Sequence, residues 1–240
     1  MNREEREIQH FNKLAEEKQY AWWGSKTYSG KFRKKVRAEM AKKYIGSFKG
    51  KNFLEIGCAD GSYSFYLQKV FEGNNLISTD ISHGQIKLAI SKSHGNFKVE
   101  DAENMSFVDE SFDHIIGNSI LHHVDADKCL HECYRVLKRG GKIFFTEPNM
   151  LNPEVFIQKH VHWLGKFLDN SPDEAAFYRW QIKENLIKAG FNDVVVENFD
   201  FLHPLFPKFS TTIVNKISRL LEKIPLIKEI SGSLIIHGKK

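Results

Sequence analysis

Short apolar runs alternate with segments of helical periodicity through the middle of the chain. Asn52 to Ile56 is a run of strand length, and Ser62 to Phe71 follows it with apolar residues at helical spacing. The predicted strands are Asn52 to Ile56, Leu76 to Thr79, Phe97 to Glu100, Phe112 to Gly117 and Lys142 to Thr146, and the predicted helices are Ser62 to Phe71, Ser82 to Ser91 and Asp125 to Leu137. This alternation predicts an α/β fold, a parallel sheet covered by helices on both faces.

Polar and glycine residues mark the predicted helix ends. Ser82 and Gln85 have the spacing of a capping box, in which each side chain satisfies a backbone donor at the helix start. Asp125 is expected to cap the next helix, and Gly140 with Gly141 is expected to end it before a new strand.

The two flanks of the chain have a different pattern. The N-terminal flank, from about Arg3 to Ile45, predicts two helices joined by an aromatic stretch. The C-terminal flank predicts a helix at Glu174 to Ala189, strands at Asp193 to Phe199 and Ser233 to His237, and an apolar stretch at Phe201 to Lys228. We therefore expect an N-terminal helical cap over residues 1–47 and a main domain over 48–240, with cap insertions at about 148–175 and 201–231.

Composition fits a single domain with a full core, since 41% of the 240 residues are hydrophobic. The three cysteines, Cys58, Cys129 and Cys133, form no even disulfide framework, and no secretory leader opens the chain. A cytoplasmic protein is therefore expected. No apolar run approaches the roughly 18 residues of a membrane span, so no transmembrane segment is expected.

The net charge of +5 is unevenly distributed. Seven cations lie in one short segment: Lys31, Arg33, Lys34, Lys35, Arg37, Lys42 and Lys43. A solvated helix face is the favoured interpretation, and a contact with phosphate or lipid headgroups is the alternative.

The first predicted strand carries an acid near its end and then breaks into small residues. The segment reads Glu55-Ile56-Gly57-Cys58-Ala59-Asp60-Gly61. A strand that enters a small-residue turn and then a helix places backbone N–H groups around a bound group. The dinucleotide pattern G-x-G-x-x-G would require glycine where Ser62 stands.

An acid followed by alternating small residues resembles motif I of the class I S-adenosylmethionine-dependent methyltransferases, whose loop wraps the methionine part of the cofactor. Ala59 replaces the usual middle glycine and is expected at negative φ. Met105 to Val124 and Glu132 to Ile143 resemble the methyltransferase type 11 (UbiE-like) pattern. The resemblance covers about Asn52 to Pro148. It implies a Rossmann-like, seven-stranded, mostly parallel sheet and S-adenosylmethionine as the cofactor, with S-adenosylhomocysteine as product.

The resemblance also implies cofactor contacts. Asp80 ends the second predicted strand, where a carboxylate can accept both ribose hydroxyls, although it could instead be a helix-entry residue. Because Ser82 supplies the helix cap, Asp80 is expected to be left for the ligand. Asp101 is assigned to the adenine amino group, with a surface-turn acid as the alternative. The full set of implied cofactor residues is Glu55, Gly57, Cys58, Ala59, Gly61, Asp80, Ile81, Asp101, Ala102, Asn118, Ser119 and, from a lid with Trp22 and Trp23, Tyr28.

The chemistry of the donor determines the candidate catalytic residues. A sulfonium methyl group is already electrophilic, so the protein must mainly hold a nucleophile in line and remove its proton. His122 or His123 is the candidate general base, because imidazole titrates near neutral pH, but one of them could simply pack under the cofactor. Glu147 is a second candidate, with substrate orientation as the alternative role.

No metal site is expected. His122, His123, Cys129, His131 and Cys133 lie close together in the sequence, but without paired Cys-x-x-Cys units or a His-Glu-x-x-His motif. Cys129 and Cys133, one helical turn apart, are therefore expected to be packed cysteines of a helix.

The resemblance predicts transfer of a methyl group to a small, partly apolar acceptor. One alternative is an RNA methyltransferase that uses the basic N-terminal face, but Asn118 and Ser119 are not followed by the Pro-Pro-aromatic motif of base-amine enzymes. The other is a non-catalytic cofactor binder. Nucleic acid is not expected as a partner, peripheral membrane contact is considered, and the chain is expected to be a monomer or homodimer. For the stretch Phe201 to Lys228 we considered a pocket cover, a dimer face and a helix on anionic lipid, in that order.

Overall fold

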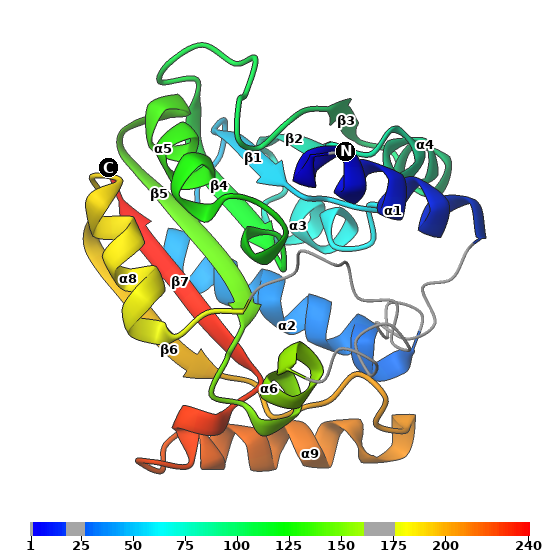
Figure 1. Cartoon of the computed structure of the whole chain (residues 1–240), viewed down its shortest axis with the longest axis vertical. Coiled ribbons are helices and arrows are strands. Elements are labelled where there is room, and N and C mark those ends of the chain that lie inside the picture. The colour runs from blue at the N-terminus through cyan, green and yellow to red at the C-terminus, as the bar shows by residue number, and fades with distance from the viewer. Residues whose placement is uncertain (1, 18–26, 161–175) are drawn as a thin grey trace.

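Seven strands form one sheet in the part of the chain that the structure, a computed structural model, describes, residues 2–17, 27–160 and 176–240. Their order is β3-β2-β1-β4-β5-β7-β6, and β7 runs antiparallel to β5 and β6 while the other neighbouring pairs are parallel (Figure 1). The strands are β1 (Asn52–Ile56), β2 (Asn75–Asp80), β3 (Asn96–Val99), β4 (Phe112–Asn118), β5 (Leu137–Pro148), β6 (Asn192–Phe199) and β7 (Ser233–Lys239). The predicted mostly parallel α/β sheet is confirmed.

Helices cover both faces of this sheet, as expected. They are α1 (Arg3–Glu17), α2 (Tyr28–Ile45), α3 (Ser64–Val70), α4 (His83–Lys92), α5 (Ala126–Val136), α6 (Pro153–His160), α8 (Arg179–Lys188) and α9 (Lys208–Leu221), with short 3-10 helices at Leu121–His123 and Lys228–Ile230. Leu130 of α5 and Ile182 of α8 belong to one core, while Ile45 of α2 and Leu67 of α3 belong to the other. The sheet therefore separates two hydrophobic cores.

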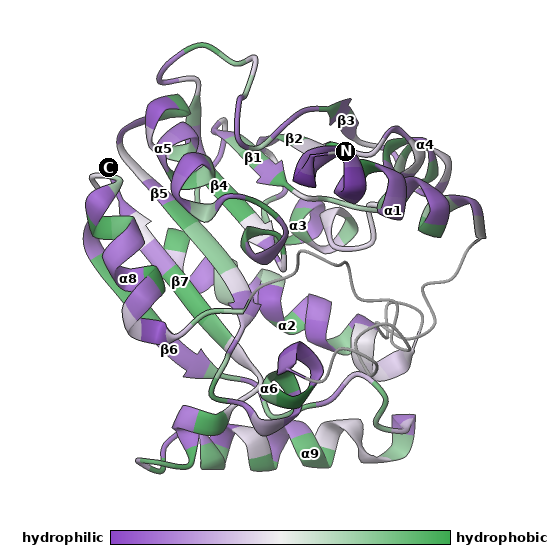
Figure 2. Cartoon of the chain, in the orientation of Figure 1, coloured by the Kyte–Doolittle hydropathy of each residue, from purple (hydrophilic) through white to green (hydrophobic). Residues whose placement is uncertain are grey.

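Strand β1 shows why the sheet is buried on both sides. Side chains alternate between the faces of a strand, and Leu54 and Ile56 enter the core beneath α5 while Phe53 enters the core beneath α2. Parallel pairing with β2 and β4 satisfies the backbone on both edges of β1. Figure 2 shows hydrophobic positions along the central strands. None of the helices among the described residues is long and apolar enough to cross a bilayer.

Two predicted boundaries are wrong. Gly140 and Gly141 do not end a helix, because α5 ends at Val136 and the chain becomes extended at Leu137, so both glycines lie inside β5. Gly140 has φ +77°, and the pairing of β4 with β5 shifts register around it. The glycines therefore serve a strand irregularity, which periodicity does not distinguish from a helix end.

The helix predicted from Glu174 begins only at Arg179, and residues 174 and 175 lie outside the described part of the chain. Phe177, which was placed in that helix, instead forms a bridge with Asn149. Because Phe177 pairs with Asn149, it is extended and not helical. Helix propensity within the segment does not predict such a contact with a distant residue.

Two helix caps follow the expectations to different degrees. Asp125 caps α5 by accepting a hydrogen bond from the N–H of Lys128 at 3.2 Å, as predicted. Ser82 accepts one from the N–H of Gln85 at 3.1 Å, but the Gln85 side chain donates to the carbonyl of Phe11 in α1. The predicted capping box is therefore half formed, because α1 takes its second partner.

The fold allows a stability prediction at Phe144, which is fully buried in the core beneath α2. Phe144→Ala removes buried contacts and leaves a cavity, so we expect the free energy of unfolding to fall by about 3–5 kcal/mol. Val108→Ala, at a side chain that is 76% exposed, is the control and should change it by less than about 0.5 kcal/mol. Urea denaturation measures both, and similar losses for the two variants would contradict this packing.

Candidate active site

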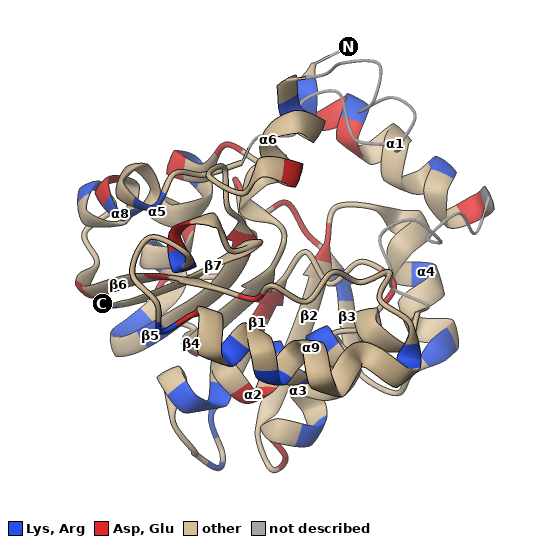
Figure 3. Cartoon of the chain, turned by 90° about the horizontal axis from the view of Figure 1, so that it is seen from below, with Lys and Arg blue, Asp and Glu red and all other residues tan. Residues whose placement is uncertain are grey.

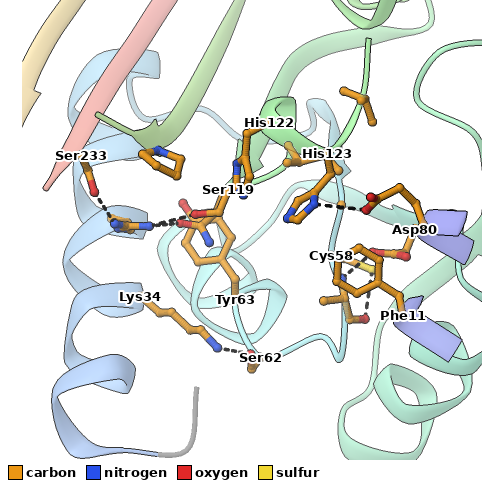
Figure 4. A pocket seen from close by; sticks show the side chains of 18 of the residues that line it. Phe11, Lys34, Cys58, Ser62, Tyr63, Asp80, Ser119, His122, His123 and Ser233 are labelled. Carbon is orange, nitrogen blue, oxygen red and sulfur yellow. Dashed lines mark hydrogen bonds and ion pairs between the residues drawn. The ribbon is translucent and has the colours of Figure 1, made fainter. Parts of the chain in front are cut away.

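A cavity of about 430 Å³ lies at the carboxyl ends of the parallel strands. The loops after β1, β2 and β4 line it together with residues of α1 and α2 (Figure 4). The loop after β3, helix α6 and the segment 200–204 complete the lining. Open α/β sheets bind ligands at this edge because the parallel strands all direct their following loops to it. The cavity therefore lies where the resemblance places the cofactor.

The loop after β1 adopts a left-handed backbone conformation at several positions. Gly57 has φ +68°, and a Cβ at this position would lie 2.6 Å from the Ile120 side chain, so glycine is required both for conformation and for space. The expectation for Ala59 is wrong, because its φ is +46°. Its N–H donates to Asp80 Oδ2 at 2.9 Å, and this bond holds the unfavourable conformation.

Ser119 is a second non-glycine residue with positive φ in the cavity wall, at +56°. Its N–H donates to the carbonyl of Thr146 in β5 at 2.7 Å. Strained backbone persists where neighbouring contacts fix it, and such positions cluster at functional sites. Ala59 and Ser119 face the same cavity from two different loops.

Asp80 lies at the end of β2 and lines the cavity. The sequence analysis expected its carboxylate to be free for a ligand, but protein N–H groups already bind both oxygens. Its two carboxylate oxygens accept hydrogen bonds from the N–H groups of Ala59, at 2.9 Å, and Ser82, at 3.0 Å. Each oxygen keeps a further lone pair for another donor. Burial raises the pKa of Asp80, against the effect of these two N–H groups.

Glu55 and Gly61 lie beneath the loop and do not line the cavity. Glu55 accepts a hydrogen bond from the Ser78 hydroxyl at 2.6 Å, and burial raises its pKa to about 7. Gly61 faces α4, where an added Cβ would lie 3.0 Å from the Cβ of Ala89. Both residues therefore shape the loop from behind.

The loop after β3 contributes Asp101 and Ala102 to the cavity wall. Asp101 also accepts a hydrogen bond from the N–H of Glu103 at 2.8 Å, so it stabilises its own turn. Glu103 forms an ion pair with Arg3 of α1 and accepts from the N–H of Asp125. Ile81, Cys58 and Asn118 line the cavity as well, which brings the predicted residues of four separate loops together.

Glu147 lies behind the cavity wall, fully buried at the end of β5. One of its oxygens accepts from the N–H groups of Ile120 and Leu121, each at 2.9 Å, and the other lies 2.6 Å from His122 Nδ1. An ionised carboxylate can only accept, so His122 Nδ1 is the donor in this contact. Glu147 therefore orients His122 and the loop around it.

The rings of the two candidate histidines lie against each other, with centroids 4.0 Å apart and planes tilted by 40°, but they occupy different surroundings. In Figure 4 the His122 ring lies on the side of Ser119 and Tyr63, and the His123 ring lies on the side of Phe11. His123 makes an edge contact with Phe11 and lies 3.2 Å from a Glu7 oxygen. His123 therefore contacts the N-terminal helix.

Helix α1 closes one side of the cavity. Its Asn12 side chain accepts from the Ser82 hydroxyl at 2.7 Å and from the Gly84 N–H at 3.0 Å. Glu7 and Phe11 of the same helix line the cavity. The sequence analysis predicts a different cover, a lid formed by Trp22, Trp23 and Tyr28. The two tryptophans lie outside the described residues. Tyr28 is 46% exposed, outside the cavity lining and beneath the Lys208 ammonium.

Helix α2 contributes cations that the sequence analysis did not assign to the site. The solvated-face interpretation holds for Lys31, Lys35 and Lys43, which are exposed, but it is wrong for Arg33, Lys34 and Arg37, which line the cavity. Gly30, Lys34, Arg37 and Ala41 recur at helical spacing, and this stripe was the available signal.

Lys34 donates to the Ser62 hydroxyl, and burial lowers its pKa to about 8. Lys34 is half-buried, its direct partner is a hydroxyl, and the nearby charge of Asp60 only partly offsets the effect of burial on its pKa. Tyr63 Oη, in the same wall, has no hydrogen-bond partner among the described residues. These two groups fit a polar ligand that carries a negative charge beside the β1 loop.

Arg37 connects α2 to three other elements. It donates to Asn118 Oδ1 at 2.7 Å, to Ser233 Oγ at 2.8 Å and to Asp200 Oδ2 at 3.4 Å. Burial acts to raise the pKa of Asp200, but the charges of Arg33 and Arg37 outweigh it and hold that pKa below its ordinary value. The side of the cavity formed by α2 and Asp200 thus contains a buried ion cluster.

The two helical cysteines lie away from the cavity. Cys129 and Cys133 are fully buried in the core beneath α5, as the sequence analysis predicted. Among residues 2–17, 27–160 and 176–240, no group of three His, Cys, Asp or Glu side chains is arranged to hold a metal ion.

Comparison with known proteins places this geometry in context. Residues 54–145 match the family model described as a methyltransferase domain. A demethylmenaquinone methyltransferase of Bacteroides fragilis is 28% identical over 184 residues, which is 66% of this chain and 74% of that protein. The predicted type 11 resemblance is thereby confirmed.

Solved structures agree at the level of the fold. An S-adenosylmethionine-dependent methyltransferase of Thermotoga maritima superposes with a TM-score of 0.70 at 17% identity, covering 97% of this chain and 99% of that one. Phosphoethanolamine N-methyltransferase 2 of Haemonchus contortus, in complex with S-adenosylmethionine, gives 0.64 at 20% identity, over 96% and 60% of the two chains.

The raised pKa of Glu55 predicts a pH dependence of stability. Below about pH 4.5, its ordinary value, the carboxyl is protonated in both the folded and unfolded states. As pH rises to about 7 the unfolded state ionises first, so stability is lost, on the order of 3 kcal/mol. Glu55→Gln removes this loss and keeps an acceptor for Ser78.

Urea denaturation at pH 5 and pH 8, without ligand, measures the effect. The free-energy difference between wild type and Glu55→Gln should shift in favour of the variant at the higher pH. Glu72→Gln, at an exposed position, is the matched control and should show no such shift. A constant difference for Glu55→Gln would show that Glu55 ionises normally.

Proposed function

Because this chain is a class I S-adenosylmethionine-dependent methyltransferase, we propose that it transfers a methyl group to a small, partly apolar acceptor. The observation that supports this most directly is that one cavity holds both the Asp80 loop and a separate wall built from α6 and residues 200–204. This second wall combines apolar residues (Val155, Leu202 and Pro204) with polar and charged ones (Asn152, Glu154, Gln158, Lys159, Asp200 and His203). A mixed lining of this kind suits an acceptor with an apolar body and a polar reacting group.

The cofactor would lie across the β1, β2 and β3 loops. Asp80 would accept the ribose hydroxyls with the lone pairs that Ala59 and Ser82 leave, and Ile81, Asp101 and Ala102 would face the adenine. Gly57, Cys58 and Ala59 would follow the methionine part, near Asn118 and Ser119. The cofactor supplies an electrophilic methyl group on its sulfonium, so the protein need not activate the donor.

We assign the carboxylate of the cofactor to Lys34. This ammonium is buried beside Ser62 at the end of the β1 loop, and burial disfavours its charge in the ligand-free protein. A carboxylate placed against it would restore an ion pair and add a charge-assisted hydrogen bond. Glu55 and Gly61 act indirectly, by shaping the loop, and Tyr28 receives no role at the cofactor.

We assign residues 1–47 to a cap over a methyltransferase domain of residues 48–240. Within the described residues, α1 would cover the adenine side through Phe11, while Asn12 fixes α1 to the start of α4. Segments near α6 and residues 200–204 would cover the acceptor. Such a cover excludes water, which strengthens the electrostatic contacts inside.

His122 is the proposed general base, and Glu147 is a positioning residue. Glu147 lies 2.6 Å from His122 Nδ1 and orients the imidazole, which would accept a proton from the acceptor as it attacks. His123 instead contacts Glu7 and Phe11, which suits a role in docking α1. We therefore assign His122 to proton transfer and His123 to the contact with α1.

The RNA alternative loses support from the position of the cations. Lys34 and Arg37, which contributed to the basic run, face the cavity and not the outer surface. The exposed lysines that stay on α2 are Lys31, Lys35 and Lys43. No further observation favours nucleic acid.

The cofactor assignment predicts a selective pattern of affinities. Asp80→Asn should weaken both S-adenosylhomocysteine and 5′-methylthioadenosine by at least about tenfold, because both contain the ribose. Lys34→Met should weaken only S-adenosylhomocysteine, by about tenfold, because 5′-methylthioadenosine lacks the carboxylate. Isothermal titration measures all of these, and Lys35→Met, exposed on the same helix, is the control. Equal losses for both ligands in Lys34→Met would overturn the carboxylate assignment.

The general-base assignment predicts a loss in turnover alone. With an acceptor found by S-adenosylhomocysteine release from a panel of phenols, amines and acids with apolar tails, His122→Asn should lower kcat by about 10²–10⁴. Its affinity for S-adenosylhomocysteine should stay unchanged. His131→Asn, exposed on α5, is the control. Cofactor binding without release on any acceptor would favour the non-catalytic binder.

A further inference from the structure

Helix α9 buries polar residues and exposes apolar ones, the opposite of a typical surface helix. Its buried residues are Thr211 and Ser218. Thr211 shares a hydrogen bond with Ser29 of α2 at 2.5 Å, and Ser218 accepts from the N–H of Phe201 at 2.9 Å. A surface helix normally buries its apolar stripe. Here hydrogen bonds hold the helix to the protein, and the apolar stripe is left on the outside.

The outer face of α9 is a continuous apolar ridge. Its members recur at intervals of three and four residues and continue beyond the helix end: Phe209, Ile213, Ile217, Leu220 and Ile224, followed by Leu226. Phe209 and Leu226, at the two ends, are each 84% exposed. Figure 2 shows α9 along the lower edge of the molecule, away from the sheet, with hydrophobic positions along it. Contiguous exposed apolar surface of this kind marks an interaction site.

The exposed ridge bears on the role of Phe201 to Lys228, for which the sequence predicts a pocket cover first. The segment 200–204 lines the cavity, but no residue of α9 does. Helix α9 is therefore not the pocket cover that we ranked first. The dimer face and the lipid surface are the two interpretations left for the ridge.

The charges beside the ridge distinguish these two. Lys208, Lys216 and Lys223 are exposed along α9. The acid of this segment, Glu222, faces inward, where it accepts from the N–H of Asp200 at 2.9 Å. Figure 3, in which α9 lies in front, shows Lys and Arg positions on α9 and on α2. A twofold contact through the ridge would bring these lysines toward their own copies without acids to balance them.

We propose that the α9 ridge docks on an anionic membrane surface. The apolar side chains would enter the boundary between headgroups and acyl chains, and the flanking lysines would contact anionic headgroups. An interfacial helix has this combination of an apolar face and basic margins. The docking stands on the surface of α9 alone and does not require methyl transfer.

A consequence for substrate access rests on the proposed function. Residues 200–204 line the acceptor wall of the cavity and lead directly into α9. A docked α9 places this wall next to the bilayer. An amphiphilic acceptor would then reach the cavity from the membrane, with its apolar part still in lipid.

Vesicle co-sedimentation of the full chain tests the docking. We expect binding to phosphatidylcholine vesicles that contain phosphatidylglycerol and little binding to phosphatidylcholine alone. Ile213→Glu with Ile217→Glu should abolish it, and Lys216→Gln with Lys223→Gln should lower the partition coefficient roughly 30-fold. The matched control is Ile90→Glu with Lys87→Gln on α4, where both side chains are exposed as well. This control should bind vesicles as the wild type does.

Two measurements separate the possible failures. All variants should keep wild-type affinity for S-adenosylhomocysteine, which shows that they fold and keeps this test distinct from that of the proposed function. Light scattering in the absence of lipid gives the oligomeric state. A wild-type dimer that Ile213→Glu with Ile217→Glu dissociates would overturn the proposal in favour of a second copy. Equal binding to both vesicle types, or equal losses in the α4 control, would also overturn it.

Discussion

Two strand-end carboxylates hold the loops of the site in place, and the rest of the arrangement depends on them. Asp80 at the end of β2 accepts N–H groups from the β1 loop and from the start of α4, while Glu147 at the end of β5 accepts two N–H groups from the loop after β4. A parallel sheet brings these strand ends to one edge, but it does not fix the loops that follow. A buried carboxylate with several backbone donors does fix them, since losing any bond would leave a charged group poorly solvated.

The sequence predicted the fold well because its signals are local. An apolar run such as Asn52 to Ile56 between turn residues has few alternatives to a buried strand, and β1 has these bounds. The wrong predictions concern positions whose secondary structure is determined by a tertiary contact. The sequence around Gly140 is typical of a helix end, but the chain pairs with β4 and forms β5 directly after Val136. Phe177 was predicted in a helix, but it pairs with Asn149 instead. Such pairings join residues distant in sequence, and periodicity carries no record of them.

The site was predictable in its loops and not in its helices. Motif spacing brought Gly57, Asp80 and Asp101 to the correct edge, because each directly follows a strand. Lys34 and Arg37 follow no strand, and whether a cation on α2 faces solvent or the cavity depends on how the helix rotates against the sheet. Ala59 was misjudged because residue size alone does not give its φ, which depends on its bond to Asp80.

Helix α2 connects the cavity to the surface ridge. Lys34 and Arg37 face the ligand side, while Ser29 of the same helix holds α9 through Thr211. Arg37 also contacts Asp200, whose N–H binds Glu222 just beyond α9. This polar network explains the reversed helix, because hydrogen bonds to a charged cluster require polar residues on the inner face of α9. The apolar residues must then lie outside, so the surface ridge is a physical consequence of how the cavity wall at residues 200–204 is built.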